Sequence, residues 1–202
     1  MSITKRKSII SESNVVTIDK DRIKTKLEND DPIFLEGVIQ RCNVKNKNMR
    51  IYPREILERE VDRYQEFIKQ GIAWGELDHP ESDVVEYKNA SHRIKEVSWK
   101  GDDLWGIIEV LPGQYFPSAN ILRGCIKIDA PIGFSSRGYG SETRISEDVY
   151  QVNDDFELLC WDSVSNPSTH GAFGMIKEGT SKEAILNRKL FAINSTIYDI
   201  LS

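Results

Sequence analysis

The sequence predicts an α+β protein built on a small antiparallel β-barrel, or twisted antiparallel sheet, flanked by helices. Three observations favour this class: many short apolar stretches that alternate with polar residues, few stretches with helical period, and no internal repeat. The 202 residues suffice to bury a sizeable core as one domain. We expect that domain at residues 32–178, between a flexible N-terminal arm (1–31) and a C-terminal helix and tail (179–202).

The first third of the chain contains one predicted strand and the most clearly defined helix. Residues 1–31 are polar and alternate in charge, which predicts a loosely held arm with at most a short strand at 14–18. A strand at 33–42 and a polar loop at 43–50 follow. A proline in its first turn and Gly71 after its end bound a helix at 53–70. Its apolar residues recur at helical spacing and predict a packing face: Leu57, Val61, Tyr64 and Ile68.

The remainder of the chain is predicted to be mostly β-structure. Residues 92–99 and 104–111 alternate on either side of a polar turn, which predicts a hairpin. A short helix begins at Pro117 and ends at Gly124. Further strands are predicted at 126–128, 132–137, 143–152 and 156–164. A glycine-rich loop at 165–179 and a helix at 181–190 complete the chain.

Composition excludes several classes of protein. The formal net charge of −5 argues against broad nucleic-acid binding, and no apolar run reaches membrane-spanning length. The basic N-terminus lacks the apolar core of a signal peptide. The three cysteines are far apart and form no C-x-x-C motif, so we expect reduced thiols in a cytosolic setting: Cys42, Cys125 and Cys160.

A pair of serines lies between glycines at residues 131–140 (PIGFSSRGYG). If this segment is a strand with Phe134 facing the core, Ser135 projects from the opposite face and Ser136 turns back. The glycines allow a bound peptide to approach the backbone closely. A serine hydroxyl beside backbone N–H groups and the guanidinium of Arg137 suits acyl transfer. The alternative is a strand that runs into a glycine turn.

A second candidate segment is residues 75–80 (GELDHP). His79 precedes a proline, which favours an extended backbone and a fixed ring position. A histidine can accept a proton from serine near neutral pH, and its acidic neighbours could orient the ring. The alternative is a surface turn in which Glu76 and Asp78 are merely solvated.

Asp162 is the third candidate, because it interrupts the apolar face of the strand at 156–164. A buried carboxylate needs a partner, since burial without one is costly. A histidine imidazolium would make Asp162 part of a catalytic site. Pairing with Arg137 or Arg93 would instead make it a structural ion pair, and the sequence leaves both alternatives open.

The other histidines give weaker signals. His92 begins a predicted strand and His170 lies in the predicted glycine-rich loop. A metal site formed by Glu76, Asp78, His79 and His92 is conceivable, but no ligand spacing such as H-E-x-x-H supports it. We therefore expect no metal.

Taken in order, the two candidate motifs and their surroundings resemble the prohead core proteases of T-even-type tailed bacteriophages. The resemblance is strongest at GELDHP (75–80) and IGFSSRG (132–138). It extends to NKNMRIYPREIL (46–57), WKGDDLWG (99–106), ANILRG (119–124) and WDSVSNPS (161–168). It covers about residues 34–170, and the ordered combination of motifs is specific where each alone is weak.

The resemblance implies a serine endopeptidase whose fold is related to the herpesvirus assemblins, a small β-barrel flanked by helices. It implies Ser135 as the nucleophile and His79 as the general base. Assemblins use a second histidine as the third group, whereas this chain offers Asp162, which can orient the ring equally well. We expect oxyanion stabilisation from the backbone around Ser136 and Gly138, together with Arg137.

The resemblance also implies substrates and a location. The family cleaves scaffold, core and capsid proteins inside the immature head in the host cytoplasm, after a glutamate two residues beyond an aliphatic residue. No cofactor, nucleic acid or membrane is implied, and self-association is possible. Because cleavage needs a mobile segment, we expect self-cleavage after Glu12 and Glu178. The alternative is a catalytically silent capsid-assembly or scaffold protein of the same fold, which would have no reason to keep both Ser135 and His79.

Overall fold

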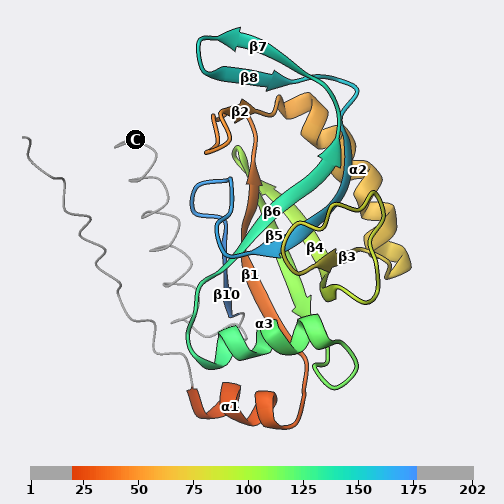
Figure 1. Ribbon diagram of the computed structural model, residues 1–202, viewed down its shortest axis with the longest axis vertical. Helices are drawn as coiled ribbons and strands as arrows, with labels where there is room; N and C mark the ends of the chain where they lie inside the picture. Colours follow the sequence, from red (N-terminus) through yellow and green to blue (C-terminus); the bar gives the residue numbers. More distant parts are fainter. Residues whose placement is uncertain (1–19, 177–202) are drawn as a thin grey trace, which may run out of the picture.

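The computed structural model describes residues 20–176, in which seven strands form one sheet (Figure 1). The strand order is β3-β4-β5-β1-β10-β6-β9, and all neighbours are antiparallel. A bridge between Leu77 and Ser163 joins the two outer strands, so the sheet is nearly closed into a barrel. The predicted α+β class is confirmed. The strands are β1 (Ile33–Arg41), β3 (Trp74–Glu76), β4 (Ala90–Lys100), β5 (Asp103–Val110), β6 (Ile132–Tyr139), β9 (Glu157–Val164) and β10 (Phe173–Ile176).

Helix α2 (Arg54–Gln70) confirms the clearest helix prediction and covers the outer strand β9. Gly71 ends it in the left-handed conformation, at φ 74°. Three polar side chains of α2 bind the backbone at the start of β9. Arg59 donates to the carbonyl of Phe156 (2.6 Å), Arg63 donates to the carbonyl of Leu158 (2.8 Å), and Glu60 accepts the N–H of Leu158 (2.8 Å). The helix therefore satisfies backbone groups that an outer strand would leave unpaired.

The core lies between the curved sheet and α2. The Tyr64 ring of α2 meets the Trp161 ring edge-on, with centroids 4.8 Å apart. The indole N–H of Trp161 donates to Gln40 of β1 (2.9 Å). The largest fully buried side chains come from the strands, from α2 and, with Leu122, from α3, and include Trp161, Tyr64, Phe134, Ile33 and Leu35.

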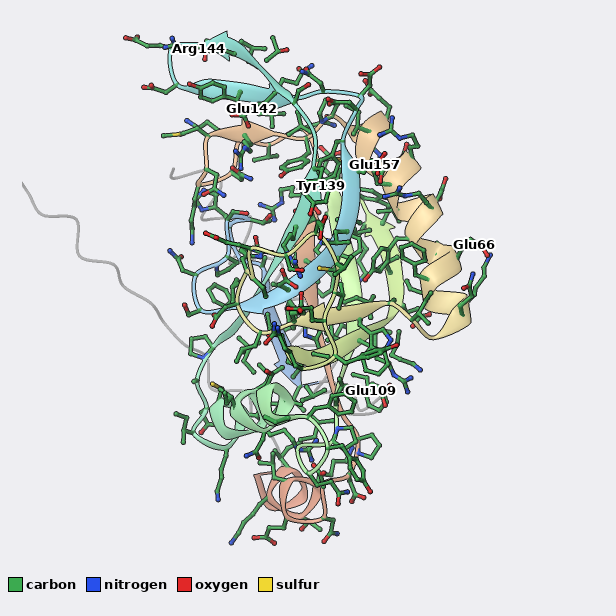
Figure 2. All side chains as sticks on the ribbon, turned by 45° about the vertical axis from the view of Figure 1, so that its right-hand side comes forward. Glu66, Glu109, Tyr139, Glu142, Arg144 and Glu157 are labelled. Carbon is green, nitrogen blue, oxygen red and sulfur yellow. The ribbon has the colours of Figure 1, made fainter. Side chains whose placement is uncertain are left out.

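A second, three-stranded sheet extends from one end of the barrel and comprises β2 (Arg50–Ile51), β7 (Glu142–Ser146) and β8 (Val149–Val152). Figure 2 shows Glu142 and Arg144 on this hairpin, far from Glu66, which points outward from α2. The predicted single strand at 143–152 is wrong, because the chain turns at residues 147–148. All of β7 is exposed, so no buried face marks where one strand ends and the next begins.

Three further predictions differ from the structure. Helix α3 (Pro117–Lys127) continues past Gly124 into the predicted strand at 126–128, because Ile126 belongs to the buried face of the helix. Strand β10 lies in the predicted loop at 165–179. Helix α1 (Lys20–Glu28) lies in the predicted arm. The predicted strand at 14–18 and helix at 181–190 fall outside the described residues. No helix within residues 20–176 is long and apolar enough to cross a membrane.

Candidate active site

The loop after β3 places His79 against β9. At Asp78 the backbone is left-handed, with φ 60°, and its N–H donates to the carbonyl of Ser163 (2.8 Å). His79 Nδ1 then lies 2.8 Å from Oδ2 of Asp162. The His79 side chain is 41% exposed, whereas Asp162 is fully buried. The carboxylate thus fixes one ring nitrogen and leaves the other directed away from it.

Ser135 lies on β6 directly opposite Asp162 on β9. Residues opposite each other in an antiparallel pair share a face of the sheet, so both side chains project from the same face. Among the residues that the structure describes, the Ser135 hydroxyl has Ser168 and not His79 as its hydrogen-bond partner, with 3.2 Å between the two oxygens. Ser136 faces the other way and hydrogen-bonds to Tyr52. The alternation along β6 thus separates the two serines as predicted.

Ser168 is a site residue that sequence reasoning did not identify. The N–H of Lys47 donates to its carbonyl (2.9 Å), which fixes this part of the loop. The neighbouring Pro167 packs on Gly133 of β6, where a Cβ would lie 2.5 Å from the proline ring. Asn166 and Pro167 predicted a loop correctly, but no spacing in the sequence links that loop to the serine strand.

Arg137 binds both Asp162 and the loop that follows His79. Its Nε donates to Oδ2 of Asp162 (2.7 Å). One terminal nitrogen donates to the carboxylate of Glu76, and the other donates to the carbonyl of Ser82 (2.5 Å). Asp162 is therefore paired with a histidine and an arginine at the same time, so both alternatives left open by the sequence are present.

Glu76 is fully buried, so the alternative of a solvated surface turn does not hold for this side chain, although Asp78 is exposed. Its Oε1 accepts the N–H of Glu86 (3.0 Å). Its own backbone N–H donates to Oδ1 of Asp162 (3.1 Å). Glu76 thus contributes to the site through its carboxylate and through its backbone.

The electrostatics keep Asp162 and Arg137 charged. Burial alone would raise the pKa of Asp162, but hydrogen bonds from His79 and Arg137 lower it below its usual range. Burial alone would lower the pKa of Arg137, but Asp162 and Glu76 raise it. All three nitrogens of Arg137 have protein partners, so its geometry suits holding the site together better than binding an oxyanion. The third member of the expected oxyanion group, Gly138, pairs with Leu158 beside a bulge in β6.

His92 is buried behind the site, where hydrogen bonds and ring packing hold it in the core. Its Nδ1 lies 2.9 Å from the Ser91 hydroxyl and its Nε2 lies 3.0 Å from the carbonyl oxygen of Trp161. Burial lowers the pKa of His92 to about 4. The ring packs edge-on against Phe134, with centroids 5.3 Å apart. His92 therefore supports the serine strand from the core side.

Arg93 and His170, the other candidate residues that the structure describes, are not part of the contacts around Asp162. Arg93 pairs with Glu109 (2.7 Å) rather than with Asp162. Within residues 20–176 no three acidic, cysteine or histidine side chains are grouped as metal ligands would be. His170 is half-buried in the loop before β10. The expected cleavage positions Glu12 and Glu178 lie outside the described residues.

The pKa of His92 makes the stability of the fold depend on pH. Because the folded pKa of about 4 lies below the unfolded value of about 6.5, the unfolded chain binds more protons between these values. The contribution of His92 is therefore complete above pH 6.5 and is lost as the pH falls toward 4, by about 3 kcal/mol in total. Urea unfolding across this window should show a decline that His92→Gln largely removes. An equal decline in both proteins would contradict this assignment.

Comparison with known proteins places this chain in a family. The family model described as "prohead core protein serine protease" matches residues 4–184. The prohead core protein protease of Enterobacteria phage T4 is 36% identical over 159 residues, which cover 75% of this chain and 72% of the relative. The solved structure of the bacteriophage T4 capsid assembly protease, gp21, matches with a TM-score of 0.61 and 34% identity, covering 66% of this chain and 82% of that chain. The chain therefore belongs to the family of prohead core protein serine proteases.

Proposed function

We propose that this protein is a serine endopeptidase that cleaves core, scaffold and capsid proteins inside the phage prohead in the host cytoplasm. Family membership and the sequence and structure matches from phage T4 support a maturation protease. The main observation in favour of serine catalysis is the 2.8 Å contact between His79 Nδ1 and the buried, charged carboxylate of Asp162. Asp162 in turn lies directly opposite Ser135 on the neighbouring strand. A catalytically silent assembly protein of this fold would not need that charge to be buried, because burial of a carboxylate is costly.

In the proposed mechanism the Ser135 oxygen attacks the scissile carbonyl and His79 Nε2 accepts its proton. Asp162 holds the Nδ1–H and stabilises the imidazolium that forms. His79 then returns the proton to the leaving amine, and water releases the acyl group by the same steps in reverse. The Ser135 hydroxyl must first rotate from Ser168 toward His79, which is consistent with catalytic contacts that tighten only when substrate binds. Backbone N–H groups near Ser136 and Gly138 are the proposed oxyanion donors.

Cleavage after glutamate in the aliphatic-x-Glu pattern is the proposed specificity, including self-cleavage after Glu12 and Glu178. Two other matches lie outside helices and strands: Glu86 is in the loop after His79, where a cut would damage the site, and Glu147 is in the turn between the paired strands β7 and β8. The remaining three lie in ordered elements, where a protease cannot extend its substrate. Glu58 is in α2, Glu96 is in β4 and Glu109 is in β5. Self-cleavage would therefore leave a protein of residues 13–178.

A serine-directed fluorophosphonate tests the proposed nucleophile. We expect one label per chain at Ser135, located by peptide mass spectrometry and unaffected by a chelator, because His79 activates this hydroxyl without a metal. Ser136→Ala, the matched control, should label normally, and His79→Ala should label far more slowly. Labelling that a chelator abolishes would indicate a metal-dependent hydrolase, and a folded protein that stays unlabelled would contradict serine catalysis.

A further inference from the structure

Helices α1 and α3 sit one above the other at the lower end of the molecule in Figure 1, away from the candidate active site. A pocket of ≈ 840 Å³ is formed by α1, α3 and the end of β10. Its apolar lining residues are Ile23, Leu27, Ile126 and Ile176. Ile176 is the last described residue, so the described part of the chain ends at the pocket.

An ion pair joins α3 to the end of α1 beside the pocket. Arg123 of α3 lies 3.0 Å from the carboxylate of Asp30, just after α1, and donates to the carbonyl of Asp31 (2.9 Å). Asp30 in turn accepts the N–H groups of Gly113 (2.8 Å) and Gln114 (3.0 Å). Since these contacts fix α1 against α3, the pocket is preformed.

Gly124 lies in the interior of α3 and lines the pocket. The choice of glycine at this position favours a segment that packs closely on the helix. A glycine destabilises a helix interior relative to alanine. Among the described residues nothing requires it, because a Cβ at this position would meet no atom within 4 Å. On the adjoining face of α3, Ile121 is 56% exposed, and Ile128, just after the helix, is 75% exposed. A bare helix face of this kind fits a segment that packs directly on the glycine.

The C-terminal sequence has the pattern such a segment needs. Five of its apolar residues recur at intervals of four, three, four and four, which is typical of one face of an amphipathic helix: Leu186, Leu190, Ile193, Ile197 and Leu201. Residues 1–19 have no comparable series. We propose that residues 186–201 of the same chain dock on α3 over Gly124 and cover this pocket. The proposal is independent of the catalytic assignment.

Hydrogen exchange of the full chain tests the docking, with Ser135→Ala as the background so that the chain stays intact. Adding Leu190→Asp and Ile197→Asp should speed the exchange of amides in α3 and in residues 186–201 by about tenfold or more, while β4 and β5 stay protected. Ile10→Asp, the matched control in the N-terminal arm, should change nothing. If Ile10→Asp speeds amide exchange in α3, the N-terminal arm is the segment that covers the pocket. If the protection of α3 is lost on dilution, the segment that covers the pocket belongs to a second copy of the chain. Either result, or no change with the tail variant, overturns the proposal.

Gly124→Ala gives an independent test, because the change in Tm that it causes should have opposite signs in two backgrounds. In the otherwise intact chain the added methyl group should meet the docked segment and lower the Tm by about 2–4 °C. In the chain with Leu190→Asp and Ile197→Asp, the same change should raise the Tm, because only the better helix propensity of alanine remains. A rise in both backgrounds would show that nothing packs on Gly124 and would overturn the docking.

Discussion

Ser135→Ala and His79→Ala are each expected to lower the rate of peptide cleavage by about 10⁴- to 10⁶-fold, with the fold retained. Each removes one partner of a single proton-transfer unit, so the double variant should be little worse than either alone. The measurement is kcat/KM on a fluorogenic peptide that contains an aliphatic-x-Glu sequence. Ser136→Ala is the matched control and should lose a few-fold at most, because its hydroxyl binds Tyr52 on the other face of β6.

The same samples test self-cleavage, which depends on the same residues. The mass of the Ser135→Ala protein should remain that of the full chain, whereas the active protein should shorten to residues 13–178. Equal losses from Ser135→Ala and Ser136→Ala would contradict the assigned nucleophile. New termini at Glu58 or Glu96 would contradict the argument that ordered elements are protected.

The features that sequence predicted are those determined within one element. The spacing of Leu57, Val61 and Tyr64 determines the buried face of α2 because a helix repeats every 3.6 residues. The alternation around Phe134 likewise determines which face of β6 carries Ser135. In both cases the signal and the structure that it predicts lie within a few residues of each other.

The features that sequence missed depend on contacts between distant elements. The carboxylate of Glu76 meets Arg137 across 61 positions of the chain, and Ser168 meets Ser135 across 33. Both contacts follow from the closure of the barrel between β3 and β9 and from the loop before β10, which no local period encodes. The error at β7 and β8 has a related cause, since an exposed hairpin has no buried face to mark its turn.

Arg137→Met is expected to cause the largest loss of stability at the site, about 3–5 kcal/mol of unfolding free energy. The substitution leaves two fully buried carboxylates, Glu76 and Asp162, without the cation between them. Urea unfolding at neutral pH measures the loss. Because Arg137 helps to hold the pKa of Asp162 below its usual range, the stabilising contribution of Asp162 normally persists until the pH falls through that lowered value. Without Arg137 this contribution should disappear at a higher pH.

Adding Glu76→Gln to Arg137→Met separates the two roles of the arginine. The amide removes one buried charge and can still accept the N–H of Glu86, so part of the lost stability should return. Cleavage should stay low, because no side chain then binds the carbonyl of Ser82 and holds the His79 loop against Asp162. If activity returned together with stability, Arg137 would act through charge balance alone. If Arg137→Met instead kept full stability and lost only kcat, the guanidinium would serve the reacting group directly, as the oxyanion assignment requires.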